Sequence, residues 1–81
     1  MMPANNDAKI SYTAIKKKLK ENGFDTTQIS DGVLRVWKSL KILGDIGYQG
    51  EFYCNSDDLV DSHWREQIEL VMQCIEAVKN N

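Results

Sequence analysis

Residues 57–79 have the sequence DDLVDSHWREQIELVMQCIEAVK and give the strongest structural signal in the chain. Apolar residues recur there at intervals of three and four, which places them along one side of a helix at about 100° per residue. This stripe consists of Val60, Trp64, Ile68, Val71, Ile75 and Val78, with His63 and Cys74 among them. An amphipathic helix gains most of its stability by packing its apolar side, so the rest of the chain must supply the surface that it contacts. We expect Asn55, Ser56 or Asp57 to cap its N-terminus.

A shorter helix is predicted from about Ser11 to Asn22. Ser11 is a suitable N-cap, and Gly23 stands where helices commonly end in a left-handed residue. The apolar positions of this helix are Tyr12, Ile15 and Leu19. The polar residues 1–9 are expected to form a flexible N-terminal arm.

The segment between the two helices favours three antiparallel strands. Asp31-Gly32 is a strong signal for a two-residue hairpin turn, and Gly44-Asp45 fits a second one. These two turns pair Ile29 with Leu34, Trp37 with Phe52, and Lys38 with Glu51. The predicted fold is therefore α+β: a helix, a three-stranded antiparallel meander and a long C-terminal helix.

The alternation of side chains along a strand predicts which residues the long helix covers. We expect it to pack across the face formed by Leu34, Val36, Leu40 and Ile42. The opposite face is expected to show Val33, Arg35, Trp37 and Lys41 beside Tyr48 and Phe52.

Residues 31–43 also admit a helical interpretation, with Ser30 as N-cap and Gly44 at the C-terminal end. The protein would then be mostly α and would resemble a winged helix-turn-helix layout, although it contains no residue motif of that family. Gly32 would lie in the first turn, where it costs about 1 kcal/mol relative to alanine. The residues that favour strands instead are Val33, Val36, Trp37 and Ile42.

Length and composition indicate one small soluble domain over residues 1–81. The chain is 42% hydrophobic and 27% charged, which is typical of a folded domain. Its formal net charge is -2, but the charges are segregated. Residues 1–44 contain eight Lys or Arg and four Asp or Glu, whereas residues 45–81 contain two and eight. Such segregation predicts one basic and one acidic surface.

Several functional classes lack a signal in the sequence. There is no CxxC, HxxxH or phosphate-binding glycine loop, so we predict no metal, no cofactor and no enzymatic activity. His63 is expected to be partly buried and hydrogen-bonded to Gln67 one turn later; an enzyme would need His63, or Asp57 and Asp58, to line a pocket.

Cysteine usage and hydropathy bear on the location of the protein. Cys54 and Cys74 are expected to be free thiols, because the predicted helix would separate them by roughly 25 Å along its axis and a disulfide needs Cα atoms within about 7 Å. No apolar run is long enough for a signal peptide or a membrane span, which predicts a cytoplasmic location without membrane contact.

The functional prediction is a small non-enzymatic interaction or regulatory protein that binds another protein through a charged face. The candidate contacts on the long helix are Asp61, Arg65, Glu66, Glu69, Met72 and Glu76. A second copy could bury part of this helix, which would give a homodimer through the C-terminal helix.

The alternative is a nucleic-acid-binding regulator that uses the basic N-terminal half. Basic residues interleaved with aromatic ones on one sheet face are typical of platforms that stack single-stranded bases. The candidate contacts are Lys16, Lys17, Lys20, Arg35, Trp37 and Lys41. The α-β-β-β-α order resembles that of double-stranded-RNA-binding domains, by order alone and without their motifs or charge.

Overall fold

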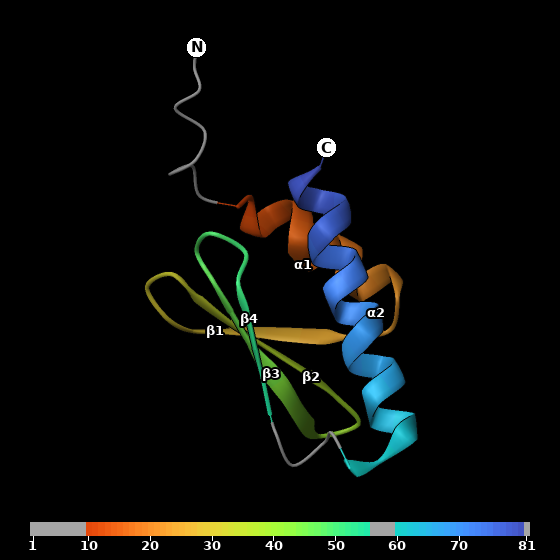
Figure 1. The fold of residues 1–81 in the computed structure, drawn as a ribbon. Helices are drawn as coiled ribbons and strands as arrows, with labels where there is room; N and C mark the ends of the chain where they lie inside the picture. Colours follow the sequence, from red (N-terminus) through yellow and green to blue (C-terminus); the bar gives the residue numbers. More distant parts are fainter. Residues whose placement is uncertain (1–9, 56–59, 81) are drawn as a thin grey trace.

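A four-stranded antiparallel sheet lies against two helices in the computed structural model, which describes residues 10–55 and 60–80 (Figure 1). The elements are α1 (Tyr12–Glu21), β1 (Asp25–Ser30), β2 (Val33–Lys38), β3 (Lys41–Gly47), β4 (Phe52–Cys54) and α2 (Ser62–Lys79). The strands lie in the order β1-β2-β3-β4. The predicted α+β class is confirmed, and the meander has four strands where three were expected.

Helix α1 agrees with its prediction. The Ser11 side chain accepts a hydrogen bond from the backbone N–H of Ala14, and Ile15 and Leu19 are buried. After the helix, Gly23 adopts a φ of +90°, a conformation that glycine allows without a steric cost. The lysines of α1 all face solvent.

The first hairpin turn lies at Asp31-Gly32, as predicted, with Gly32 at a φ of +76°. The pairing of β1 with β2 differs from the prediction by one residue at Leu34. Gln28 is opposite Leu34, because the strand has an irregularity between Gln28 and Ser30 that displaces Ile29 from the ladder. The predicted pairing of Ile29 with Leu34 was wrong for this reason.

The second hairpin turn lies at Ser39-Leu40 and not at Gly44-Asp45. Ser39 and Leu40 have φ values of 53° and 66°, the two positive angles that a type I′ turn requires. The chain therefore turns back five residues earlier than predicted, and a further turn after Gly47 leads into β4. Residues 31–43 form strands and turns, so the helical alternative and the winged helix-turn-helix layout were wrong.

Gly44 lies inside β3 because its neighbours leave no room for a side chain. A Cβ atom there would be 2.6 Å from Phe52 Cζ and 2.6 Å from the backbone oxygen of Tyr53. A glycine inside a strand often marks a place where another chain segment approaches the backbone closely, and it need not indicate a turn. With Gly44 in β3, Trp37 pairs with Ile42 and Lys38 with Lys41, so the predicted partners Phe52 and Glu51 were wrong.

The core lies between the two helices and one face of the sheet. Leu34 and Val36 are buried there as predicted, whereas Leu40 is 88% exposed in the turn and Ile42 is 42% exposed on the opposite face. The early turn changes the register of β3 and brings other side chains inward. The buried residues are Ile15, Leu19, Phe24, Leu34, Val36, Leu43, Ile46, Ile68, Val71, Cys74 and Ile75.

Helix α2 begins later than predicted. Its N-cap is Asp61, whose carboxylate accepts a hydrogen bond from the backbone N–H of His63 at 2.8 Å. Two of the predicted caps, Ser56 and Asp57, lie outside the described residues, and Val60 precedes the helix and is 87% exposed. The apolar stripe meets the core from Trp64 onward: Trp64 is half-buried against it, and Ile68 is the first buried residue of the helix.

Candidate functional site

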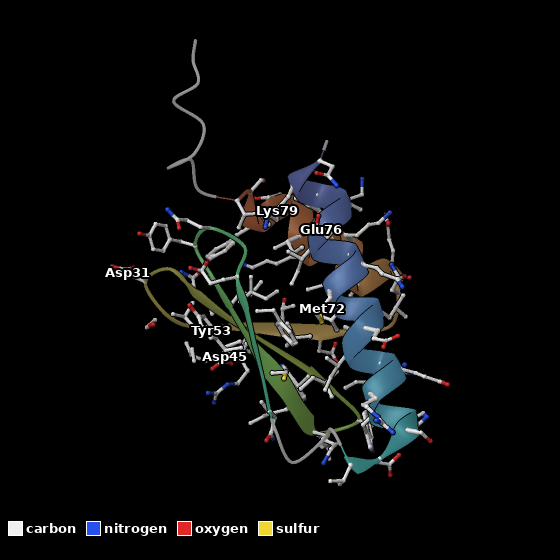
Figure 2. The ribbon with its side chains drawn as sticks, in the orientation of Figure 1. Asp31, Asp45, Tyr53, Met72, Glu76 and Lys79 are labelled. Atoms are coloured by element: carbon white, nitrogen blue, oxygen red, sulfur yellow. The ribbon has the colours of Figure 1, made fainter. Side chains whose placement is uncertain are left out.

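No element among residues 10–55 and 60–80 covers the face of the sheet opposite the helices, and a row of four residues crosses it from β1 to β4. Strand pairing sets Thr27 beside Arg35, Arg35 beside Asp45, and Asp45 beside Tyr53. Figure 2 shows Asp45 and Tyr53 on the side of the sheet away from α2. Tyr53 is 64% exposed, so its ring is available for contact with a partner.

An ion pair occupies the middle of this row. Arg35 Nε donates to Asp45 Oδ1 at 2.9 Å, and its second nitrogen donates to Oδ2 at 3.2 Å. These hydrogen bonds and the charge of Asp45 raise the pKa of Arg35 above its ordinary value. The bidentate geometry fixes the guanidinium, and each charge is compensated by the other.

Apolar groups lie beside the ion pair. Trp37 is half-buried and lies opposite Ile42, and its indole Nε1 donates to Thr27 Oγ1 at 3.1 Å. Because the indole nitrogen has a partner, the accessible part of the ring presents carbon atoms. We call this surface the outer sheet face; it comprises Thr27, Val33, Arg35, Trp37, Ile42, Asp45 and Tyr53.

The structure does not bring the predicted nucleic-acid contacts together. Arg35 and Trp37 lie on the outer sheet face, but Lys41 lies on the helix side, with its Nζ 5.6 Å from the centre of the Trp64 ring. The other three, Lys16, Lys17 and Lys20, are exposed on α1. The predicted shared face of basic and aromatic residues was therefore wrong, because the early turn reverses the side on which Lys41 lies.

Two aromatic residues predicted for the same face are also placed elsewhere. Phe52 packs against the core, on the helix side of β4. Tyr48 follows β3 in a turn. A base-stacking platform of the predicted composition is therefore not assembled.

The six predicted protein contacts on the last helix all face solvent. Asp61 serves as the N-cap of α2, and Glu76 lies 3.8 Å from Lys79 Nζ. Met72 is 49% exposed beside the acidic residues. The exposed residues of this surface are Asp61, Arg65, Glu66, Glu69, Met72 and Glu76. Their contact with a partner stays a prediction.

The prediction for His63 was wrong. Its side chain is exposed, and its ring lies edge-on to Trp64 with 4.8 Å between the ring centroids. Gln67 instead accepts a hydrogen bond from Lys38 Nζ at 2.9 Å. His63 is in the first turn of α2, before Ile68, the first buried residue of the helix. Asp57 and Asp58, the other catalytic candidates, lie outside the described residues.

Both cysteines are free thiols. Cys54 is exposed, and Cys74 is buried. Burial raises the pKa of the Cys74 thiol.

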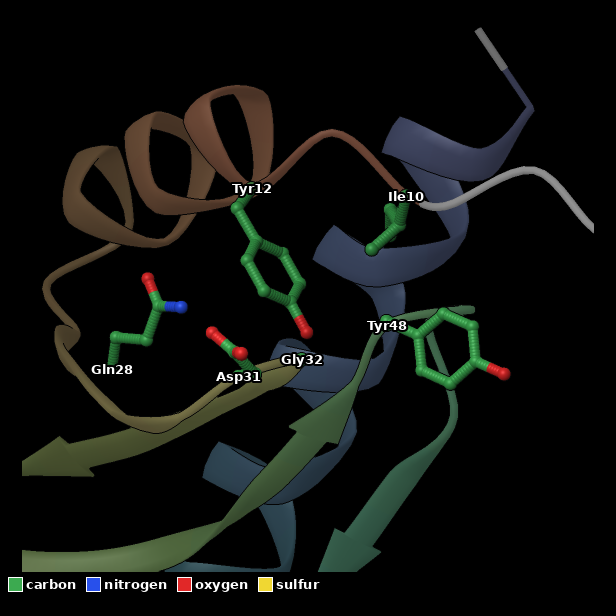
Figure 3. Close-up of a pocket in the computed structure, with 6 residues that line it drawn as sticks. All are labelled: Ile10, Tyr12, Gln28, Asp31, Gly32 and Tyr48. Carbon is green, nitrogen blue, oxygen red and sulfur yellow. The ribbon is translucent and has the colours of Figure 1, made fainter.

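A pocket of about 520 Å³ lies between the start of α1, the β1–β2 hairpin and the turn after β3 (Figure 3). It is lined by Ile10, Tyr12, Gln28, Asp31, Gly32 and Tyr48. The backbone N–H of Ile10 donates to Tyr48 O at 2.7 Å, which joins two of its walls. Sequence reasoning missed this pocket because its residues come from three separate segments, and Asp31-Gly32 was considered only as a turn.

The Tyr12 side chain forms the inner wall of the pocket. Its hydroxyl lies 3.5 Å from the carbonyl oxygen of Ile46, at the limit of a hydrogen bond. Burial, followed by the negative charge of Glu51, raises the pKa of Tyr12. The Tyr12 phenol is therefore neutral at physiological pH.

Residues 10–55 and 60–80 contain neither a metal-binding cluster nor a helix suited to span a membrane. No group of three or more His, Cys, Asp or Glu side chains there could hold a metal ion. In the same residues, neither helix has the length and apolar character needed to cross a membrane. Comparison with protein-family models, curated proteins and solved structures finds no match to this chain, so its functional assignment rests on the surfaces described above.

Proposed function

We propose that this protein binds a different protein through its outer sheet face and catalyses no reaction. The observation that supports this proposal is the uncovered face itself, where Trp37, Ile42 and Tyr53 surround an internally compensated ion pair. Grouped exposed apolar side chains mark interaction sites. Trp, Tyr and Arg are also the residues that contribute most to binding energy in protein interfaces.

The charge balance of this face favours a protein over a nucleic acid. Arg35 is the only basic residue of the outer sheet face, and both of its hydrogen bonds go to Asp45. Nucleic-acid binding depends on several Lys or Arg side chains that neutralise phosphates. A compensated Arg–Asp pair suits contact with a mostly apolar protein surface, because covering it leaves no net charge without a counter-ion.

The acidic outer side of α2 is the competing surface for a protein partner. Its apolar content is small, with Met72 half-exposed among Glu66, Glu69 and Glu76. Exposed charges add modestly to affinity and mainly affect the association rate. We therefore assign the contact to the outer sheet face and treat α2 as the comparison surface in the experiment.

Site-specific photo-crosslinking in cells that express the protein tests this assignment. A benzophenone side chain is placed at position 53 or 42 on the outer sheet face, at 66 or 69 on α2, and at 17 on α1 as a control. We expect one adduct of defined mass from positions 53 and 42 and none from 17. In extract, excess wild-type protein should abolish that adduct, and the Tyr53→Asp variant should compete poorly.

Three other results would contradict the proposal. Adducts from positions 66 and 69 alone would move the contact to α2. An adduct of twice the chain mass would show that the partner is a second copy. Loss of the adduct after nuclease treatment would favour the nucleic-acid alternative with the α1 lysines as the contact.

A further inference from the structure

We infer that the pocket beside α1 binds a cationic group, an ammonium or guanidinium, at the Asp31 carboxylate and beside the ring of Tyr12. The pocket lies on the helix side of the molecule, so this inference is independent of the outer sheet face. Its volume of about 520 Å³ lies within the range of small-ligand sites. It can hold a lysine or arginine side chain or a small free amine.

The walls of the pocket are held in place before any ligand enters. The Ile10–Tyr48 backbone hydrogen bond joins the segment before α1 to the turn after β3. The hairpin tip also packs on that turn, since a Cβ at Gly32 would lie 3.4 Å from Tyr48 Cβ. Figure 3 shows the Tyr12 ring pointing from α1 toward the hairpin, with Gln28 and Tyr48 on opposite sides of it. A preformed site lowers the ordering cost of binding.

The charge of the pocket selects a cation. Asp31 is the only charged residue among the described residues of the lining, and the same part of the chain gives it no ion pair. The negative charge of Glu51 acts on Tyr12 from nearby. The stem of Lys79 passes close to Ile10, but its ammonium group is 3.8 Å from Glu76. None of the described residues that line the pocket is basic, so they offer an anion no counter-charge.

The neutral groups of the pocket also suit a cation. Aromatic rings attract ammonium and guanidinium groups through the negative charge density of their faces. Gln28 Nε2 donates to Ser30 O at 3.4 Å, so this donor already has a partner. A charge-assisted hydrogen bond to Asp31 completes the set. With one exposed carboxylate and one aromatic face, we expect a Kd on the order of 10 mM for a minimal ligand.

Titration followed by two-dimensional ¹⁵N NMR tests the inference with the intact chain. The probe is n-butylammonium, and butyrate is the probe of similar size and opposite charge. We expect saturable shifts at the amides of Tyr12, Asp31, Gly32 and Tyr48 with n-butylammonium and none with butyrate. Failure to saturate by about 50 mM, or equal shifts with butyrate, would overturn the assignment.

Two variants and a matched control locate the site. Asp31→Asn keeps a turn-forming residue and removes the charge, and we expect it to weaken binding at least about tenfold. Tyr12→Leu keeps an apolar side chain without the aromatic face, and we expect about threefold weaker binding. Asp25→Asn removes a similarly exposed carboxylate on β1 and should leave binding unchanged. Wild-type affinity in both pocket variants would refute the site.

The source of the cation is distinguished by two capped peptides, acetyl-Gly-Lys-Gly-amide and acetyl-Gly-Arg-Gly-amide. Binding of either peptide at least about threefold tighter than n-butylammonium would assign the pocket to a side chain of a protein partner. Equal or weaker binding would assign it to a small free amine. Either ranking supports a cation site, and neither depends on the crosslinking result for the outer sheet face.

Discussion

Replacement of Gly44 by alanine tests the register of the sheet. The new methyl group would lie 2.6 Å from both Phe52 Cζ and Tyr53 O, whereas an ordinary van der Waals contact is at least about 3.4 Å. The Tyr53 oxygen belongs to the backbone of β4, so it cannot rotate away. Strand β4 must shift relative to β3, and such overpacking costs about 2 to 3 kcal/mol.

The same strand offers a matched control at Gly47. A Cβ at that position would lie 2.5 Å from Glu51 Oε1, but this atom is the end of a flexible side chain that can move. Neither Gly44 nor Gly47 has a positive φ, so alanine adds no backbone strain at either site. We therefore expect Gly47→Ala to change the free energy of unfolding by less than about 1 kcal/mol.

Urea unfolding followed by far-ultraviolet circular dichroism measures both variants. With a slope of about 1 kcal/mol per M for a domain of this size, Gly44→Ala should lower the midpoint by roughly 2 M. Phe52→Leu in the Gly44→Ala background should restore part of this loss, since it removes one of the two close contacts. A Gly44→Ala protein as stable as Gly47→Ala would refute the pairing of β3 with β4.

Three further variants or measurements test other parts of the structure. Replacing Ser39-Leu40 by Asn-Gly should raise the free energy of unfolding in urea by about 1 to 2 kcal/mol. The replacement removes two left-handed residues that disfavour positive φ, and the exposed Leu40 side chain has few contacts to lose. A loss of stability would contradict the type I′ turn. Trp64→Ala should cost about 1 to 3 kcal/mol, less than for a fully buried tryptophan, because Trp64 is half-buried; an unchanged midpoint would show that the first turns of α2 are not packed. At pH 8 Cys54 should react with an aromatic disulfide reagent much faster than Cys74. The Cys74 thiol is buried, and burial raises its pKa and lowers its thiolate fraction. Equal reaction rates would contradict the packing of α2.

Both helices could be predicted because their signals are local. The interval of three and four residues identified Ile68, Val71 and Ile75 as buried, and the structure buries them. Ser11 and Gly23 marked the ends of α1 through capping chemistry that acts within a few residues. The start of α2 was less predictable, since Val60 continues the apolar interval yet is 87% exposed.

The strand register could not be predicted because the decisive turn has no sequence signal. Serine and leucine rarely adopt positive φ, whereas Gly44-Asp45 contains the glycine that such turns favour. Gly44 is required for a different reason, the close approach of Phe52 and Tyr53. A glycine needed for packing between strands is indistinguishable in sequence from one needed for a turn.

The position of the turn at Ser39-Leu40 also determines the composition of the outer sheet face. Because the chain reverses there, Ile42 lies opposite Trp37 on the uncovered side, and Asp45 lies opposite Arg35. The residues that follow can then form β4, which places Tyr53 beside Asp45. A reversal at Gly44-Asp45 would instead put Asp45 in the turn and leave the Arg35 guanidinium without its carboxylate. The unpredicted turn and the proposed contact surface therefore have one cause, and an Asn-Gly turn at positions 39 and 40 should stabilise the fold without weakening partner binding.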